Sequence, residues 1–101
     1  MTKYDTIEKE FHQIEDIVVE YYQIDKNDLL KSNKEEVVDA RYCLISILCD
    51  KYQDSIIAKV SGLSKSVVNK IRNIVGNKNK SRSFYFDLNN VKSIAYNKIN
   101  Y

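Results

Sequence analysis

Few residues in this sequence could perform covalent or metal chemistry. His12 is the only histidine, so a histidine-based metal cluster or a nucleophile–histidine–carboxylate set has no spare members. Cys43 and Cys49 lie six residues apart in a segment of helical pattern, which is not the C-x-x-C spacing of redox and zinc pairs. We interpret both cysteines as small buried hydrophobic residues. The sequence therefore predicts a protein that is not an enzyme and that holds no metal or cofactor.

The basic residues, by contrast, follow a pattern that suits a polyanion. Residues 1–30 carry three lysines against eight acids, a net charge of −5, whereas the remainder carries +7. No Asp or Glu occurs between Asp54 and Asp87, and that window holds Lys59, Lys65, Lys70, Arg72, Lys78, Lys80 and Arg82. Cations that neutralise phosphates release condensed counterions, so nucleic acid is a natural partner. On charge alone, a solvated basic surface without a ligand is an equal alternative.

The elements that must position these cations are helices. The chain has two glycines and no proline, which disfavours an all-β fold with many tight turns. Apolar residues repeat at spacings of three and four in an N-terminal stripe of Ile7, Phe11, Ile14, Val18 and Tyr21. We expect a small all-α bundle that forms a single domain over residues 1–101.

The remaining helices and loops can be placed in the same way. Asp25 is expected to cap a short turn, which leads into a loop over 31–34. The segment 35–52 is apolar around so much of its circumference that it should be the central helix. After a loop over 76–83, a last helix is expected over about 87–100, with Asp87 as its N-cap.

Residues 54–75 fit a helix-turn-helix. Ala58 is small where the second helix would cross the first, and Gly62, four residues later, permits the left-handed turn that ends the first helix. Ser64 is expected to cap the second helix, and Val68 to point into the core. An ordinary helical hairpin is the alternative, and the acid-free basic window favours the DNA-binding motif.

The second helix divides into an apolar and a polar face at 100° per residue. The apolar face, expected in the core, consists of Val67, Val68, Ile71, Ile74 and Val75. A major-groove reader needs short polar groups on the opposite face and cations at its borders. Because recognition helices read bases mainly near their N-terminal end, we expect base contacts from Ser64, Lys65, Ser66, Asn69 and Lys70. Phosphate contacts are expected from Lys59, Arg72, Lys78, Lys80 and Arg82.

The segments before residue 54 add a resemblance to a known family. In 17–30 a hydrophobic helix is followed by a short segment that ends in Leu29-Leu30, and Val38-Asp39-Ala40-Arg41-Tyr42 follows as the start of the central helix. With the helix-turn-helix, these segments resemble the C-terminal DNA-binding domain of the bacterial replication initiator DnaA over roughly residues 14–75. The resemblance implies a Trp-repressor-like helical bundle, sequence-specific duplex binding at an origin-like site, and Arg41 as a phosphate contact.

The chain departs from this family where the family reads DNA. The signature Gly-Gly-Arg-Asp-His-Thr-Thr-Val is replaced by the segment 61–68, Ser-Gly-Leu-Ser-Lys-Ser-Val-Val, so the family's target sequence does not carry over. The family's basic loop corresponds to Lys31 and Lys34, which we expect to contact phosphates, followed by Glu35 and Glu36. The chain also offers no room for the initiator's nucleotide-binding domain, so ATP-driven origin opening is not expected of it.

The expected function is sequence-specific binding of double-stranded DNA, with a role in replication initiation or its regulation. No apolar stretch approaches the roughly 20 residues that span a bilayer, and no hydrophobic signal run opens the chain, so we expect a cytoplasmic protein without a membrane partner. A helix-turn-helix transcriptional regulator is one alternative. Another is a helical module that binds protein instead of DNA, with the acidic residues 5–28 as a second surface. The oligomeric state stays open.

Overall fold

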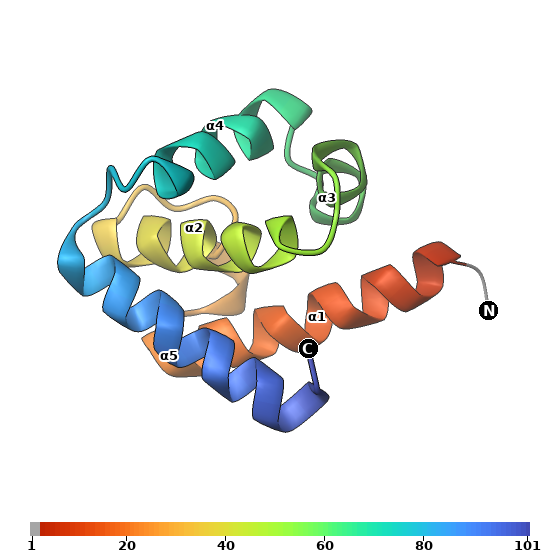
Figure 1. Cartoon of the computed structure of the whole chain (residues 1–101), viewed down its shortest axis with the longest axis horizontal. Helices are drawn as coiled ribbons and strands as arrows, with labels where there is room; N and C mark the ends of the chain where they lie inside the picture. Colours follow the sequence, from red (N-terminus) through yellow and green to blue (C-terminus); the bar gives the residue numbers. More distant parts are fainter. Residues whose placement is uncertain (1–2) are drawn as a thin grey trace.

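Apolar residues spaced three and four apart produce helices throughout residues 3–101, the part of the chain that the computed structural model describes (Figure 1). Those residues form no strand, so the expected all-α fold class is confirmed. The elements are α1 (Lys3–Tyr22), the 3₁₀ helix η1 (Lys26–Asp28), α2 (Glu35–Cys49), α3 (Asp54–Ser61), α4 (Lys65–Gly76) and α5 (Arg82–Ile99).

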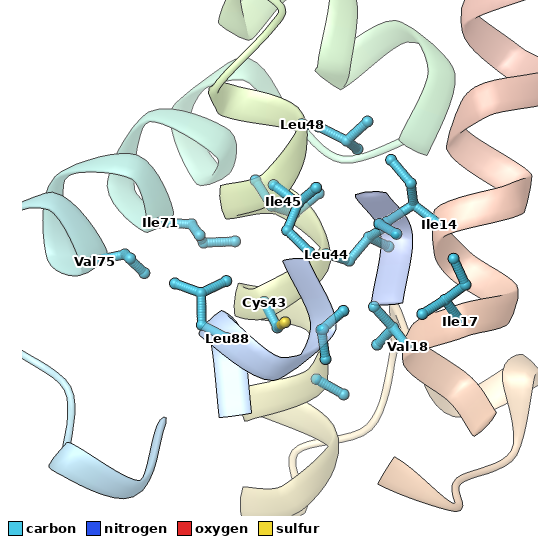
Figure 2. Close-up of a cluster of buried hydrophobic side chains, with 14 of the residues drawn as sticks. Ile14, Ile17, Val18, Cys43, Leu44, Ile45, Leu48, Ile71, Val75 and Leu88 are labelled. Atoms are coloured by element: carbon cyan, nitrogen blue, oxygen red, sulfur yellow. The ribbon is translucent and has the colours of Figure 1, made fainter. Parts of the chain in front are cut away.

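Helix α2 is the central element, as its apolar circumference predicts. All six residues from Cys43 to Leu48 are buried, and α2 contacts each of the other four α-helices. In Figure 2, α2 lies between Ile14, Ile17 and Val18 of α1 on one side and Ile71 and Val75 of α4 on the other. Helices α1 and α4 therefore lie on opposite sides of α2 (Figure 1).

Helix α1 buries the expected stripe. Ile7, Phe11, Ile14 and Val18 are at most 3% exposed, and Tyr21 is partly buried at the end of the stripe. The Tyr21 hydroxyl donates to Asp87 Oδ1 at 2.8 Å and accepts from Asn90 Nδ2 at 3.1 Å, which joins α1 to α5. The turn after α1 is capped by Asp25, whose carboxylate accepts from the Asn27 amide at 2.9 Å, as predicted.

The start of the last helix was predicted wrongly. Helix α5 begins at Arg82, because the Ser81 hydroxyl caps it by accepting from the Phe84 amide at 3.2 Å. Phe84 is 1% exposed and extends the apolar stripe of Leu88 and Val91 back by one turn, although it lies before the expected start of the helix at 87. Asp87 lies inside α5 and caps nothing there; its carboxylate accepts the Tyr21 hydroxyl instead.

Candidate nucleic-acid interface

The junction between α3 and α4 has the predicted local structure. Gly62 ends α3 at φ +79°, in the left-handed region, and its amide donates to Ala58 O at 2.9 Å. The Ser64 hydroxyl caps α4 by accepting from the Val67 amide at 3.1 Å. Between them, the Leu63 amide donates to Ser61 Oγ at 3.2 Å. These bonds fix the position at which α4 leaves α3.

Helix α4 packs on α2 and α3 through a narrower stripe than predicted. Val68 and Ile71 are at most 1% exposed and Val75 is 9% exposed, which confirms three of the five expected core residues. Ile74 is only partly buried, and Val67 is 38% exposed, so its assignment to the core is wrong. Val67 lies one position, or 100°, from Val68 and falls outside the arc that α2 and α3 cover.

The opposite side of α4 is exposed along its length. The exposed residues include all five expected base-contacting residues, Ser64, Lys65, Ser66, Asn69 and Lys70, and also Asn73. Asn69 is engaged within the chain, because its Nδ2 donates to Asp54 Oδ2 at 3.0 Å and its Oδ1 accepts from Asn73 at 3.2 Å. Asn69 must exchange these exposed partners before it can pair with a base.

Asp54 is a residue of this region that sequence reasoning missed. It bounds the acid-free window in the sequence, yet in the fold its Oδ1 lies 2.6 Å from Arg72 Nη2 on α4. The same guanidinium nitrogen donates to Tyr52 O at 3.1 Å. The signal was Asp54's position in the first turn of α3, where the helix dipole favours an acid. Arg72 thus ties α4 to the start of α3.

Two further expected phosphate contacts also have partners within the chain. Lys80 Nζ lies 2.6 Å from Asp39 Oδ1 and 4.9 Å from the centre of the Tyr42 ring. Arg41 donates from Nε to Leu29 O at 2.9 Å and from Nη2 to Ser32 O at 2.6 Å, so it closes the loop before α2. Phosphate binding by Arg41, Arg72 and Lys80 stays a prediction, since each of the three would have to exchange a partner within the chain.

The other seven cations of the expected set are exposed, and none has an acidic oxygen within 4.0 Å in the described part of the chain. We call them the unpaired cations: Lys31, Lys34, Lys59, Lys65, Lys70, Lys78 and Arg82. Lys59 Nζ lies 4.0 Å from the centre of the Tyr4 ring, and Lys78 Nζ lies 4.9 Å from that of Tyr85. Aromatic faces attract these ammonium groups without neutralising their charge.

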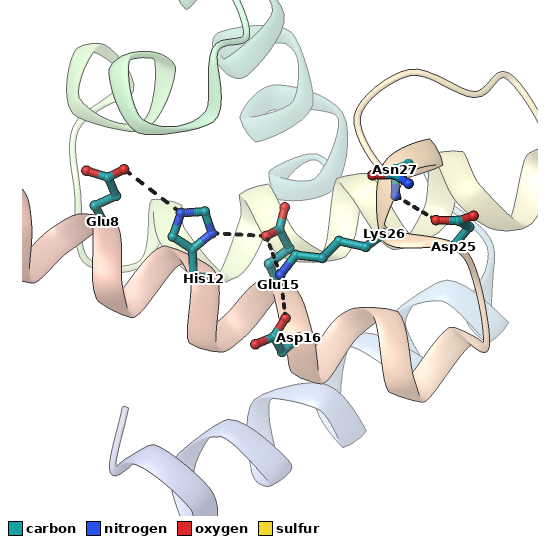
Figure 3. A network of polar contacts seen from close by, with 7 residues as sticks. All are labelled: Glu8, His12, Glu15, Asp16, Asp25, Lys26 and Asn27. Atoms are coloured by element: carbon teal, nitrogen blue, oxygen red, sulfur yellow. Dashed lines mark hydrogen bonds and ion pairs between the residues drawn. The ribbon is translucent and has the colours of Figure 1, made fainter.

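The acids of α1 are bound within the chain, unlike these cations. Glu15 is 6% exposed and lies 3.1 Å from His12 Nδ1, while Lys26 Nζ lies 3.5 Å from Glu15 and 2.8 Å from Asp16 (Figure 3). Glu10 accepts from Tyr52 Oη at 2.6 Å and from Lys51 Nζ at 3.0 Å. These contacts pair the acids of α1 with residues of two turns, the one that follows α1 and the one that follows α2. They therefore hold α1 against both turns.

The cysteines and acids of residues 3–101 can be checked for metal-binding groups and for reactive thiols. No group of three or more His, Cys, Asp or Glu residues there could hold a metal ion. Burial raises the pKa of Cys43 to about 12 and also raises the pKa of Cys49, so neither is a thiolate at neutral pH. No helix in the same range has the length and apolar character needed to cross a membrane.

Comparison of the chain with known protein families, with curated proteins and with solved structures finds no match.

Proposed function

We propose that this protein binds double-stranded DNA with α4 in the major groove. The observation that carries the proposal is the set of unpaired cations. They lie on α3, on α4, in the segments before α2 and α5 and at the start of α5, and they have no acidic partner among residues 3–101. Elsewhere in the described chain, lysines such as Lys26, Lys51 and Lys92 have carboxylates within 3.0 Å. Phosphates would supply the missing anions.

The exposed side of α4 supplies groups suited to base edges. A major groove about 12 Å wide admits one helix, and its base edges present acceptors, donors and thymine methyl groups. Lys65, Ser66 and Lys70 offer donors there, and the exposed Val67 offers an apolar group beside them. Asn69 and Asn73 add amides whose present partners are also exposed. This mixture suits sequence-specific binding.

The resemblance to the DNA-binding domain of DnaA supports a role in replication initiation or its regulation. A transcriptional regulator would use the same surface, and the target sequence distinguishes the two roles. The alternative of a protein-binding module is less well supported. It would use the acidic residues as a second surface, and Glu10, Glu15 and Asp16 have partners within the chain.

Selection of bound sites from random duplex DNA, followed by titration at several salt concentrations, tests the proposal. About four to six phosphate contacts give a slope of roughly −4 to −5 in log K against log salt. Recovery of one consensus site with such a slope supports the proposal, whereas an affinity indifferent to salt, or no selected sequence, contradicts it.

Substitutions on α4 and at a paired lysine sharpen this test. Lys65→Gln with Lys70→Gln should flatten the slope by about one to two units, whereas the paired Lys51→Gln should leave it unchanged. Asn69→Ala should cost about 1–3 kcal/mol on the selected site and little on scrambled DNA. An equal loss of affinity for both duplexes would show that Asn69 does not read a base.

A further inference from the structure

The outward side of α5 carries two exposed aromatic side chains. The exposed large hydrophobic residues among residues 3–101 are Tyr4, Val67, Phe86 and Tyr96, and the last two lie on α5. Each of these two side chains is 67% exposed. The Phe86 side chain has no polar atom that water can hydrate, so a surface that covered it would gain from the hydrophobic effect.

A groove of about 610 Å³ lies at the other end of α5 and opens beside Tyr96. Its lining combines the C-terminal half of α5 with the end of α2, the turn that follows α2, and Tyr101. The Tyr101 ring is held in place, because its hydroxyl donates to Ile47 O at 2.9 Å. Grooves of about 300–1,000 Å³ suit compact apolar groups, and an aromatic side chain is one of these.

The groove opens on the side of α5 that presents Phe86. At 100° per residue, Ser93 and Asn97 follow Phe86 by seven and eleven residues, and both lie within about 20° of it around the helix. Both are exposed, and both line the groove. Tyr96 is ten residues from Phe86, a distance of about 15 Å along the helix axis. One continuous face of α5 therefore carries the exposed ring and the groove.

The charged residues of the groove already have partners within the chain. Lys92 Nζ lies 2.9 Å from Asp50 Oδ2, and Lys51 Nζ lies 3.0 Å from Glu10 Oε2. A polyanion or a strongly charged protein would have to exchange these pairs in order to bind there. The groove thus favours an uncharged occupant.

The stretch of the face between Phe86 and Tyr96 is also uncharged. Its exposed residues are Asn89 and Ser93, which are short and polar. Two copies of this face can therefore approach each other without repulsion between like charges, and their short central side chains allow the two helices to come close. The charge pattern fits a second copy of the same chain.

We infer that α5 docks on α5 of a second copy, so that Phe86 of each protomer is seated in the groove beside the partner's Tyr96. A two-fold axis midway between Phe86 and the groove exchanges the two positions and makes both contacts at once. Helix α5 has 18 residues and is about 27 Å long, so the interface is at the small end of the known range, and association is expected between about 10 μM and 1 mM. The exposed side of α4 takes no part, so the inference is independent of DNA binding.

Sedimentation equilibrium of the DNA-free protein, from about 10 μM to about 1 mM, tests the inference. The mass of the parent should rise from 11.8 kDa towards twice that value. Phe86→Ser should raise the dissociation constant about 100-fold, because the substitution removes the ring from both contacts. Val67→Ser, at an exposed apolar position on α4, is the control and should associate as the parent does. A parent that keeps the mass of one chain at about 1 mM, or an equal loss in both variants, would overturn the inference.

A mixture of two variants tests whether the ring enters the groove. Asn97→Arg places a long charged side chain at the groove and should weaken association as Phe86→Ser does. A mixture of the two variants can form one intact contact, between Phe86 of one chain and the open groove of the other. The mixture should therefore associate about tenfold more tightly than either variant alone.

Both substituted positions are exposed, so thermal melts of the two variants should match the parent. Should one variant fail to fold, the other variant and the concentration series of the parent decide. A mixture that associates no better than its separate components would overturn the inference, even if the parent dimerises, because another surface would then hold the two copies together.

Discussion

Helix α1 and the α3–α4 pair are both strongly charged, yet they use their charges differently. On α1, Glu10, Glu15 and Asp16 lie within 3.5 Å of lysines from later in the chain. On α3 and α4, Lys59, Lys65 and Lys70 have no acidic partner in the described structure, and Arg72 alone is paired, with Asp54. One set of charges fastens the fold, and the other is left for a partner.

This difference shows that the net charge of a segment does not by itself indicate whether the segment can bind a charged partner. Whether its charges are already paired within the chain matters more. The lysine ends of these pairs are exposed, so each pair contributes only about 0–1 kcal/mol to holding α1, and it also neutralises an acid that would otherwise repel an anionic ligand. Unpaired lysines on α3 and α4 repel one another weakly, and a bound polyanion removes that repulsion.

The largest expected effect is a loss of folding stability at one of two adjacent valines of α4, of which one is buried and the other exposed. Val68→Asp places an unpaired charge at a fully buried position and should cost about 3–5 kcal/mol, enough to unfold much of the population. Val67→Asp, at a 38% exposed position, should change stability by less than about 0.5 kcal/mol and should still weaken DNA binding. Urea denaturation of both variants checks this, and equal losses would contradict the assigned faces of α4.

A smaller effect is expected at the turn that aims α4. Gly62→Ala forces a side chain into φ +79° and should cost about 1–2 kcal/mol, although a Cβ there meets no atom within 4 Å. Gly76→Ala is the matched control, because it is equally open but helical and should stabilise by about 0.5–1 kcal/mol. If thermal melts shift both variants in the same direction, the left-handed turn does not account for the cost.

Two further variants each free one cation from its acidic partner, one on α4 and one near α1. Asp54→Asn frees Arg72 on α4 and should steepen the salt slope of DNA binding by about one unit. Glu10→Gln frees Lys51 near α1 and should leave the slope unchanged. Titrations of the selected duplex at several salt concentrations measure both, and a steeper slope in Glu10→Gln would extend the DNA-binding surface to α1.

The smallest effect concerns Tyr22, whose buried hydroxyl has no hydrogen-bond partner in the described chain. Burial raises the pKa of Tyr22 well above its ordinary value of 10.0. Its stabilising contribution is therefore fully present below pH 10 and declines as the pH rises further, because the unfolded chain loses the proton first.

Tyr22→Phe should leave stability at neutral pH nearly unchanged and should flatten the decline above pH 10. Some decline should persist, since burial and the bond to Glu10 raise the pKa of Tyr52 to about 12. Tyr96→Phe, at a 67% exposed position, is the control and should reproduce the parent profile. Urea denaturation from neutral pH to about pH 11 decides, and a Tyr22→Phe profile that matches the parent would contradict the burial effect.

Local rules made much of the fold predictable from the sequence. The left-handed Gly62, the Ser64 cap and the Asp25 cap each depend on atoms within three or four residues, so spacing alone identifies them. The central position of α2 follows from its apolar circumference, which needs no knowledge of its neighbours.

The errors and omissions concern features that tertiary neighbours decide. Val67 and Val68 have the same side chain, and only the packing of α2 and α3 on α4 makes one exposed and the other buried. The acid-free window is defined by position along the chain. In the fold, Asp54 and Asp39, which lie at its edge and outside it, form ion pairs with Arg72 and Lys80. The start of α5 was missed because one buried aromatic residue, Phe84, lies a full turn before the recognised stripe.

Cys43 and Cys49 differ in burial, so the rates at which their thiols are modified can measure how the structure opens. Cys43 is fully buried at the middle of α2, so a thiol reagent can modify it only after the core around α2 opens. Cys49 is only partly buried at the last turn of α2, so fraying of that turn is sufficient for the reagent to modify it. The ratio of the two modification rates compares local opening with global unfolding in one sample, without any added label.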